Sequence, residues 1–372
     1  MSNKFIPVNI PKLYNSEKTN VINCVRTNWI SSEGKFVKEF EKKFSQYNSR
    51  KFGVAVSSGT AALEVAIKSL NLKKNSEVII PSFSIIATAL CVVKCGLKPI
   101  LVDCSLSTWN MDPEKVLKKI SKKTSAIIIT HIYGLPVDLQ KIMNVAKKKN
   151  IKIIEDAAEV IGLKYKNRMC GSFGDVSTFS FYANKHITTG EGGAILSDNS
   201  EFIKKGRQLI NLDFNNTERF KHNNLYWNHR ISGLQAALGI SQINGLEKVI
   251  KKKINQGRIY EKLLEDYKDI ISIQPSTFKG VDNHYWVFGI LLKKEGIRDK
   301  LIKELLNEGI ETRPFFWPLH LQSALPKKFF QKDLKLESSE NLGRNGLYIP
   351  IGNHISEADQ RRIIKVLLNK IK

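Results

Sequence analysis

The sequence predicts an α/β protein with a large domain built on a mostly parallel β-sheet, followed by a smaller α/β domain. Short apolar runs alternate with amphipathic stretches from Phe52 to about Ser197, which is typical of strands joined by helices. The apolar runs are nearly continuous, as expected for strands covered by helices on both faces. A second α/β pattern follows in the last third of the chain. The 372 residues, 42% of them hydrophobic, suffice for both domains.

The large domain is predicted to contain seven strands with helices between them. We interpret the apolar runs as strands at residues 53–57, 77–80, 99–103, 125–131, 151–155, 176–181 and 193–197. The amphipathic stretches predict helices at residues 61–72, 85–95, 113–122 and 139–149. The strand-helix order favours parallel pairing, because a helix between two strands returns the chain to the same end of the sheet.

The pattern after residue 197 becomes helical, with long helices expected between residues 232 and 267. The smaller unit is predicted to hold a strand at 285–292, a helix at 298–308, a short strand at 310–314 and a final helix at 357–370. We therefore divide the chain near residue 250, into domains 1–250 and 251–372. Residues 1–35 are expected to lie near the active site or in the small domain.

The net charge of +24, from 59 basic and 35 acidic residues, raises the question of a polyanionic partner. The lysines, however, occur in short clusters along the whole chain without interleaved aromatic residues, and the sequence has no nucleic-acid-binding motif. We therefore expect no nucleic-acid partner. A basic surface still favours a phosphorylated small substrate.

Three features of the sequence bear on location and metals. No run approaches the ~20 apolar residues needed to span a membrane. Residues 1–7 lack the apolar core of a secretion signal. The five cysteines are odd in number and show no metal-ligand spacing, which favours buried free thiols. We expect a soluble cytoplasmic protein without a membrane partner or a bound metal.

Lys185 stands between the predicted strand at 176–181 and a loop rich in small, polar and glycine residues. A lysine at such a strand end can be partly desolvated, which lowers the pKa of its amine and lets it form a Schiff base with a carbonyl. Taken alone, the residue is explained as well by ordinary surface charge.

Two further strand ends carry polar groups, and ligands of parallel sheets bind beyond the carboxyl ends of the strands. Gly59 and Thr60 follow the first strand and open a helix, whose free N–H groups and dipole favour a single phosphate. Asp156 follows the strand at 151–155, where a carboxylate needs a cationic partner such as a protonated pyridine nitrogen. The alternatives are an ordinary helix cap, and a capping or metal-binding aspartate.

The hydroxyl of Ser180 and its neighbours can add donors to the same phosphate. A cradle for one phosphate, a carboxylate for a pyridinium and a lysine for a Schiff base together predict pyridoxal phosphate as the cofactor. The lysine would hold the cofactor aldehyde and later move protons at the substrate carbon.

The chain resembles the DegT/DnrJ/EryC1/StrS family of pyridoxal-phosphate sugar aminotransferases nearly from end to end. The motifs that carry this resemblance lie at residues 58–63 (SGTAAL), 155–159 (EDAAE), 171–175 (GSFGD), 179–185 (FSFYANK) and 189–193 (TGEGG). The resemblance implies the aspartate-aminotransferase fold (fold type I) and a homodimer with the active site at the subunit interface. It also implies pyridoxal 5'-phosphate as cofactor, with pyridoxamine phosphate as an intermediate form.

The resemblance assigns roles to individual residues. Lys185 forms the Schiff base, Asp156 pairs with the pyridinium, and Glu159 lies near the ring. The phosphate is held by a further set of residues: Gly59, Thr60, Ser180 and, from the neighbouring subunit, Asn228.

One position departs from the family. Where relatives place an aromatic residue against the cofactor ring, this chain has Ile85. An aliphatic side chain can pack on the ring but loses aromatic stacking, about 0.5–1.5 kcal/mol beyond burial. Either the cofactor is bound less tightly, or Phe83 or another ring compensates.

Within the family, three segments resemble those of GDP-perosamine synthases: residues 27–34 (TNWISSEG), 131–134 (HIYG) and 311–320 (ETRPFFWPLH). They supply the candidates for substrate contact, which are Trp29, Ser31, Ser32, Arg313, Trp317 and His320. Packing of the small domain against the large one is the alternative role of each. Arg313 is preferred, because a guanidinium can clamp a phosphate or carboxylate through two hydrogen bonds.

The resemblance implies transamination of a nucleotide-linked 4-keto-6-deoxyhexose, led by GDP-4-keto-6-deoxy-D-mannose, with L-glutamate as amino donor. The first alternative is amination at C3 or C4 of a UDP- or dTDP-linked keto sugar. The second is a sugar 3-dehydratase, although such relatives replace the Schiff-base lysine with histidine, whereas this chain has Lys185 followed by His186. The third, suggested by charge alone, is a nucleic-acid-binding protein.

Overall fold

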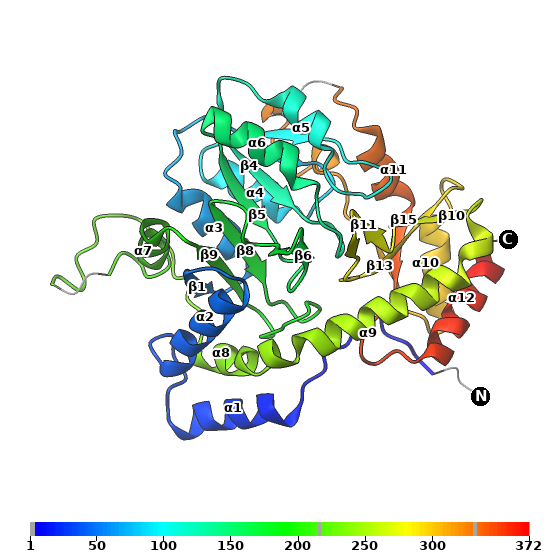
Figure 1. Cartoon of the computed structure of the whole chain (residues 1–372), viewed down its shortest axis with the longest axis horizontal. Helices are drawn as coiled ribbons and strands as arrows, with labels where there is room; N and C mark the ends of the chain where they lie inside the picture. Colours follow the sequence, from blue (N-terminus) through cyan, green and yellow to red (C-terminus); the bar gives the residue numbers. More distant parts are fainter. Residues whose placement is uncertain (1–3, 215–216, 330–332, 372) are drawn as a thin grey trace.

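The computed structural model describes residues 4–214, 217–329 and 333–371, so residues 1–3 of the segment inspected for a secretion signal lie outside the described residues. It consists of two bodies joined by one long helix, α9 Gln242–Leu263 (Figure 1). The large body contains a seven-stranded sheet, and the small body lies at the other end of α9. Because α9 passes residue 250 without a break, the division of the chain at that residue stays a prediction.

The large sheet has the strand order β1-β9-β8-β5-β4-β2-β3. Its strands are β1 Phe52–Val56, β2 Glu77–Pro81, β3 Lys98–Val102, β4 Thr124–Thr130, β5 Lys152–Asp156, β8 Val176–Ser180 and β9 Gly193–Ser197. β9 runs antiparallel to both neighbours, and the other paired strands are parallel. The mostly parallel sheet is confirmed, and each predicted strand agrees to within one residue at either end.

Side chains alternate along each strand between two cores, one on each face of the sheet. On β4, Ile127 and Ile129 belong to one core, and Ala126 and Ile128 to the other. The first core is covered by α2 Lys35–Tyr47, α5 Pro113–Lys119, α6 Leu139–Lys149 and α8 Gly233–Ile240. The second is covered by α3 Gly59–Ser69, α4 Ala87–Lys94 and α7 Ser200–Leu209.

The predicted helices are confirmed as elements, but several boundaries differ. The helices predicted at 61–72 and 113–122 end three residues earlier, at Ser69 and Lys119. The helix predicted at 85–95 begins only at Ala87, which leaves Ile85 in the preceding turn. The long helices expected between 232 and 267 are α8 and α9.

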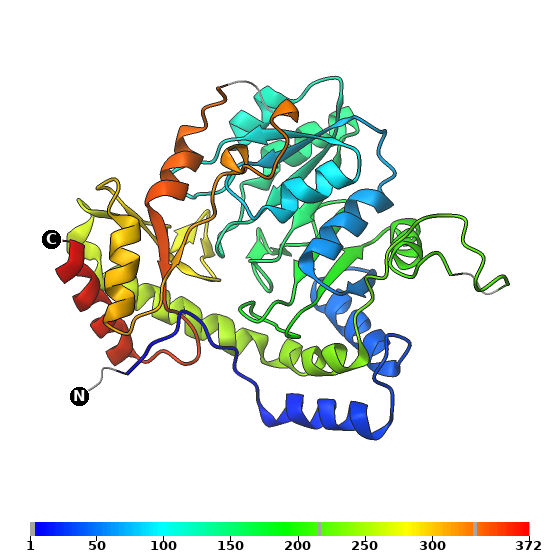
Figure 2. The ribbon, with the colours of Figure 1, turned by 180° about the vertical axis from the view of Figure 1, so that it is seen from behind.

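The N-terminal segment contacts both bodies. Ile6 forms a β-bridge with Ile310 of the small body. Helix α1, Asn15–Arg26, packs on α8 of the large body. Figure 2 shows this segment passing along α9 from one body to the other.

The small body is a four-stranded antiparallel sheet in the order β10-β13-β15-β14, with helices packed on it. Its elements are β10 Ile271–Ile273, β13 Phe288–Leu292, α10 Arg298–Asn307, β14 Arg313–Pro314, α11 Glu337–Asn345, β15 Gly346–Ile349 and α12 Glu357–Ile371. The remaining short elements are β6 Lys164–Tyr165, β7 Arg168–Met169, β11 Thr277–Phe278, β12 Val281–Asp282, η1 Glu265–Tyr267, η2 Leu319–Leu321 and η3 Lys327–Phe329.

The predicted helices at 298–308 and 357–370 are confirmed to within one residue. The strand predicted at 285–292 is wrong over its first three residues. It begins at Phe288, because Tyr285 has a φ of 44°, which lies outside the extended region. The strand predicted at 310–314 shortens to Arg313–Pro314.

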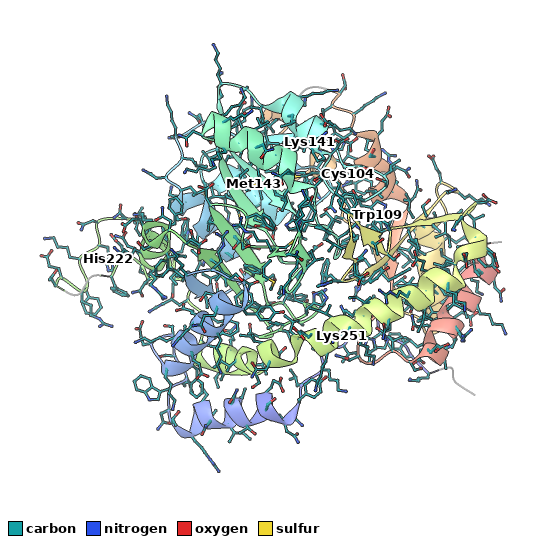
Figure 3. All side chains as sticks on the ribbon, in the orientation of Figure 1. Cys104, Trp109, Lys141, Met143, His222 and Lys251 are labelled. Carbon is teal, nitrogen blue, oxygen red and sulfur yellow. The ribbon has the colours of Figure 1, made fainter. Side chains whose placement is uncertain are left out.

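An aromatic cluster joins the two bodies. The ring centroid of Phe315 lies 5.0 Å from those of Trp109 and Tyr133 and 5.8 Å from that of Phe83. Figure 3 shows Trp109 between the large sheet and the small body. Gly134, with a φ of 110°, permits the contact, since a Cβ there would lie 2.4 Å from the main-chain nitrogen of Tyr285. The small body is thereby held against the loop that follows β4.

Two expectations about the whole chain can be compared with the described ranges. No helix in them combines the length and the apolar character that a membrane span requires. All five cysteines lie in these ranges as free thiols, four of them buried, as predicted.

Candidate active site

The predicted cofactor residues come together at the carboxyl ends of three parallel strands. Gly59 and Thr60 begin α3 shortly after β1, Asp156 ends β5, and Ser180 ends β8. Together with Lys185 they line one cavity of about 400 Å³. Parallel strands end at the same edge of the sheet, which is why residues so far apart in the sequence meet there.

Gly59 lies where α3 approaches β8. A Cβ at this position would lie 2.8 Å from the Cβ and 3.1 Å from the Oγ of Ser180. The Oγ of Ser58 caps the helix by accepting a hydrogen bond from the N–H of Ala61 at 3.1 Å. Because a cap satisfies only part of the first turn, the turn can both cap the helix and bind an anion.

Lys185 is a buried amine with a side chain that is 8% exposed. Its Nζ lies 3.9 Å from Oε1 of Glu159 and 3.5 Å from the centroid of the Trp286 ring. Burial lowers the pKa of this amine, and the charges of Glu159 and Asp156 offset part of that shift. A larger neutral fraction makes the amine a better nucleophile toward a carbonyl.

The two carboxylates of the cavity are buried as well. Asp156 accepts a hydrogen bond from the N–H of Ala158 at 3.2 Å, and burial raises its pKa. Within the described ranges no cation forms an ion pair with it. Burial also raises the pKa of Glu159 to about 7, and its Oε2 accepts the N–H of Tyr133 at 2.8 Å. A buried carboxylate without a cation is costly, so Asp156 is suited to a cationic ligand group.

Glu155, His131 and Cys170 lie next to this cavity, with possible ligand atoms within 4.8 Å of one another. Two of the three side chains, those of Glu155 and His131, are engaged in hydrogen bonds. Glu155 bonds with Nε2 of His131 at 3.0 Å and accepts three main-chain N–H groups of residues 171–174 at 2.6, 2.8 and 3.2 Å. Nδ1 of His131 accepts the N–H of Val137, which places the ring proton on Nε2. Glu155 and His131 thus anchor the 171–174 loop through these hydrogen bonds.

Ile85 lines the cavity and is 44% exposed. Phe83, considered as a compensating ring, is instead fully buried in the aromatic cluster and is not among the described residues that line the cavity. Aromatic lining is supplied by a different set: Phe179, Tyr182, Trp286, Phe316 and Tyr348. Of these, Trp286, Phe316 and Tyr348 come from the small body. The sequence did not predict that these three residues line the cavity, although Phe316 belongs to the 311–320 segment, because their place depends on how the two bodies pack.

Three of the predicted substrate residues, Trp29, Ser31 and Ser32, lie in the loop between α1 and α2. This loop rests on the start of α8, where the N–H of Gly233 donates to the carbonyl of Ile30 at 2.9 Å. The structure does not bring them to the cavity of Lys185 within the described part of this chain. Their contact with substrate stays a prediction.

The other three lie in or after β14. Arg313 pairs in register with Tyr348, a cavity residue, and forms an ion pair with Glu311. Trp317 is exposed. The buried ring of His320 contacts Oγ of Ser82 through Nδ1 at 2.8 Å and Glu340 through Nε2 at 3.2 Å. The bond to Ser82 ties the segment to the large body, and the bond to Glu340 ties it to α11 of the small body. Substrate contact by all three stays a prediction.

Asn228 is exposed and lies outside the cavity, with its Oδ1 accepting a hydrogen bond from Nε of Arg230 at 2.9 Å. It forms a bridge with Asn211 at the base of a segment that extends away from the large body (Figure 1). Figure 3 shows His222 in this segment, which also exposes the apolar side chains of Phe220 and Leu225. That Asn228 contacts the phosphate in a neighbouring subunit stays a prediction.

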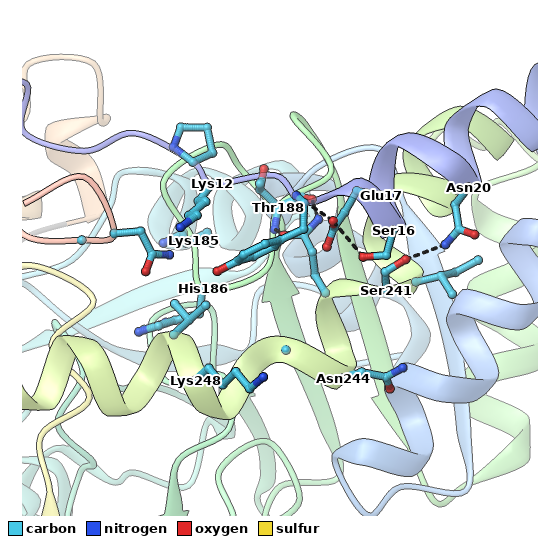
Figure 4. A pocket seen from close by; sticks show the side chains of 18 of the residues that line it. Lys12, Ser16, Glu17, Asn20, Lys185, His186, Thr188, Ser241, Asn244 and Lys248 are labelled. Atoms are coloured by element: carbon cyan, nitrogen blue, oxygen red, sulfur yellow. Dashed lines mark hydrogen bonds between the residues drawn. The ribbon is translucent and has the colours of Figure 1, made fainter.

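A second cavity of about 580 Å³ shares Lys185 with the first. Figure 4 shows Lys185 and His186 above α9, with Lys248 on the helix and Lys12 on the N-terminal segment. Lys253 also lines it, and this fully buried amine donates a hydrogen bond to the carbonyl of Trp286 at 2.8 Å.

Lys253→Met is expected to change how stability depends on pH. Burial lowers the pKa of Lys253 to about 7, from an ordinary value of 10.5. Between these values the unfolded chain binds a proton that the folded chain does not, so stability rises with pH by up to about 1.4 kcal/mol per unit. Urea unfolding at several pH values should show that the variant lacks this contribution. Lys251→Met, at an exposed lysine on the same helix, should keep it; equal slopes for wild type and Lys253→Met would contradict the expectation.

Comparison with known proteins agrees with the geometry. Residues 11–368 match the family described as the DegT/DnrJ/EryC1/StrS aminotransferase family. The GDP-perosamine synthase of Caulobacter vibrioides is 36% identical over 97% of both chains, and that of Escherichia coli O157:H7 is 34% identical over 93% of both. A solved DegT/DnrJ/EryC1/StrS aminotransferase from Brucella abortus superposes with a TM-score of 0.86, at 29% identity over 95% of both chains. The chain therefore belongs to the DegT/DnrJ/EryC1/StrS family and is a pyridoxal-phosphate-dependent sugar aminotransferase with the fold of its class.

Proposed function

We propose that this enzyme transfers the amino group of L-glutamate to C4 of GDP-4-keto-6-deoxy-D-mannose, producing GDP-perosamine. The observation that carries the proposal is the buried amine of Lys185, which faces one cavity together with Asp156 and the turn at Gly59. The choice of sugar is supported by the names of the two relatives described above and by the three sequence segments similar to GDP-perosamine synthases.

The residues of the cavity fit pyridoxal phosphate. The turn at Gly59 and the hydroxyl of Ser180 would hold the phosphate, because a side chain at residue 59 would fill the space between them. Asp156 would accept a hydrogen bond from the protonated ring nitrogen, whose charge compensates the buried carboxylate. Lys185 would hold the aldehyde carbon. When bound, the cofactor supplies an electron sink for the carbon that carries the amino group.

Lys185 would act as the proton carrier in both halves of the reaction. Displaced by the amine of glutamate, its Nζ takes the proton from Cα of the donor and later delivers a proton at C4 of the sugar. The lowered pKa of Lys185 suits this task, since the neutral amine accepts the proton and its ammonium form donates it. Glu159, whose Oε1 lies 3.9 Å from Nζ, would stabilise the ammonium form by its opposite charge. Ping-pong kinetics are expected.

We also propose that the enzyme is a homodimer in which Asn228 reaches the phosphate site of the neighbouring subunit. The extended segment next to Asn228, with its exposed Phe220 and Leu225, supports this proposal, because exposed apolar side chains favour a protein contact. The cytoplasmic location expected from the sequence stays a prediction.

The test is an assay of purified enzyme with glutamate and a panel of GDP-, UDP- and dTDP-linked 4-keto-6-deoxy sugars. We expect a GDP-linked product aminated at C4, formed in equal amount with 2-oxoglutarate. If only the UDP- or dTDP-linked sugars are converted, the proposed GDP-linked substrate is wrong. A deoxygenated product without nitrogen would contradict transfer to the sugar and favour the dehydratase alternative.

Gly59→Ala is expected to weaken the affinity for pyridoxal phosphate by about tenfold or more, because the new Cβ meets Ser180 at 2.8 Å and displaces the phosphate turn. Fluorescence titration of cofactor-free protein measures the effect. Gly245→Ala is the matched control, since a Cβ at Gly245 meets nothing within 4 Å. Unchanged affinity of the Gly59 variant would show that this turn does not hold the phosphate.

A further inference from the structure

We infer that Trp286 is a positioning residue for Lys185, which presents its indole face to the ammonium form of the lysine and so sets the balance between the charged and neutral amine. The inference rests on the proposed function in one respect, the assignment of Lys185 as the reactive amine. It concerns a residue of the small body, which reaches the lysine only because the two bodies are packed together.

The contact between the two side chains is close and dry. Nζ of Lys185 lies 3.5 Å from the centroid of the Trp286 ring, whereas the next shortest distance from a lysine or arginine to a ring in the described chain is 4.7 Å. The side chain of Lys185 is 8% exposed, and Trp286 is 5% exposed. A cation over an indole face is stabilised most when both groups are desolvated, as they are here.

Trp286 is fixed from several sides, so its ring cannot turn away from the lysine. Its Nε1 donates a hydrogen bond to the carbonyl of Asn184, directly before Lys185, at 3.0 Å. Its own carbonyl accepts a hydrogen bond from Nζ of Lys253 at 2.8 Å. The ring packs against Tyr133 and Phe316, with centroids at 5.8 and 6.4 Å. The same side chain therefore fixes the loop and faces the amine that the loop carries.

Some charged groups around Lys185 favour its ammonium form, and others oppose it. Asp156 at the end of β5 and Glu159 on the loop that follows favour the ammonium form. Lys253 on α9 opposes it whenever that amine is charged, and the neighbouring His186 is held neutral by burial, which lowers its pKa. In the described ranges, Nζ of Lys185 makes no hydrogen bond; it lies 3.5 Å from the centroid of the indole ring and 3.9 Å from Oε1 of Glu159. The indole ring thus stabilises the ammonium form of Lys185 together with the two carboxylates, whereas burial favours the neutral amine.

The test measures the protonation of Lys185 without cofactor or substrate. Cofactor-free, full-length enzyme is acetylated with acetic anhydride over a range of pH, and modification of Lys185 is quantified by mass spectrometry. In Trp286→Leu we expect the pKa of Lys185 to fall by about one unit, because the ammonium loses the ring face. In Trp286→Phe we expect a fall of about half that size, because a phenyl face attracts a cation more weakly than indole.

Phe316→Leu is the matched control, because it removes another aromatic ring from the same cavity wall, while the hydrogen bond from Nε1 to Asn184 and the packing against Tyr133 still hold the indole over Lys185. The pKa of Lys185 should stay at the wild-type value in this variant. Equal shifts in Trp286→Leu and Phe316→Leu, or no shift in Trp286→Leu, would overturn the inference. If Trp286→Leu does not fold, the inference is tested with Trp286→Phe alone. An unchanged pKa of Lys185 in Trp286→Phe would then overturn the inference. Since no sugar is used, failure of the proposed substrate leaves this result unaffected.

Discussion

Lys185→Ala is expected to lower the rate of amino-group transfer by about a thousandfold or more and to remove the visible absorbance of lysine-bound cofactor. Lys185 is the amine among the described residues that line the cavity with Asp156 and Gly59. In the proposed mechanism its removal deletes both the nucleophile and the proton carrier, and a positioned proton carrier alone accounts for roughly 10²–10⁴ in rate. Single-turnover kinetics with glutamate measure the first half of the reaction separately from the second.

Two controls separate chemistry from folding in this experiment. Lys251→Ala removes an exposed lysine of α9 and should retain full activity. Added methylamine should restore part of the activity of Lys185→Ala, because a free amine can move the proton in place of the side chain. Activity of Lys185→Ala within tenfold of wild type would contradict the assigned role.

Glu155→Ala is expected to destabilise the fold by about 3–5 kcal/mol, because it leaves buried donors without their acceptor. Glu155 is fully buried and accepts hydrogen bonds from His131 and from three main-chain N–H groups of the 171–174 loop. Urea unfolding followed by circular dichroism measures the loss. Activity should fall as well, since Glu155 directly precedes Asp156 and anchors the loop behind it.

The matched control is Glu114→Ala, which removes an exposed ion pair with Lys141 and should cost less than about 1 kcal/mol. The stabilities of the two variants should also depend differently on pH under acidic conditions. Burial alone would raise the pKa of Glu155, but its hydrogen bonds outweigh burial and hold the pKa below 4.5. Its contribution is therefore present above pH 4.5 and is lost as the pH falls further. A similar acid dependence in wild type and Glu155→Ala would contradict this assignment.

The large sheet was predictable because its strands are local apolar runs of the right length. The run at 151–155 is an example: whichever helix covers it, Ile153 and Ile154 must be buried on opposite faces. The strand at 285–292 was predicted wrongly from the same kind of evidence. Its first residues are apolar and aromatic, yet Tyr285 adopts a positive φ where the segment docks on Gly134. That contact spans about 150 residues of sequence, and no local pattern reports it.

The residues around the predicted cofactor site show the same difference between local pattern and long-range contact. Gly59, Asp156, Ser180 and Lys185 each follow or end a strand of one sheet, so the rule for parallel sheets predicted that they would meet. The ring next to Lys185 could not be predicted, because Trp286 belongs to the other body.

The sequence by itself determined the fold class, the seven strands of the large sheet, the family and the group of residues around Lys185, since each depends on local periodicity or on short motifs. Only the tertiary structure decided which aromatic residues line the cavity, how far Lys185 and Asp156 are buried, and that both nitrogens of His320 are occupied. These properties arise from the packing of two bodies against each other. Desolvation and ring contacts depend on distances that a linear pattern does not contain.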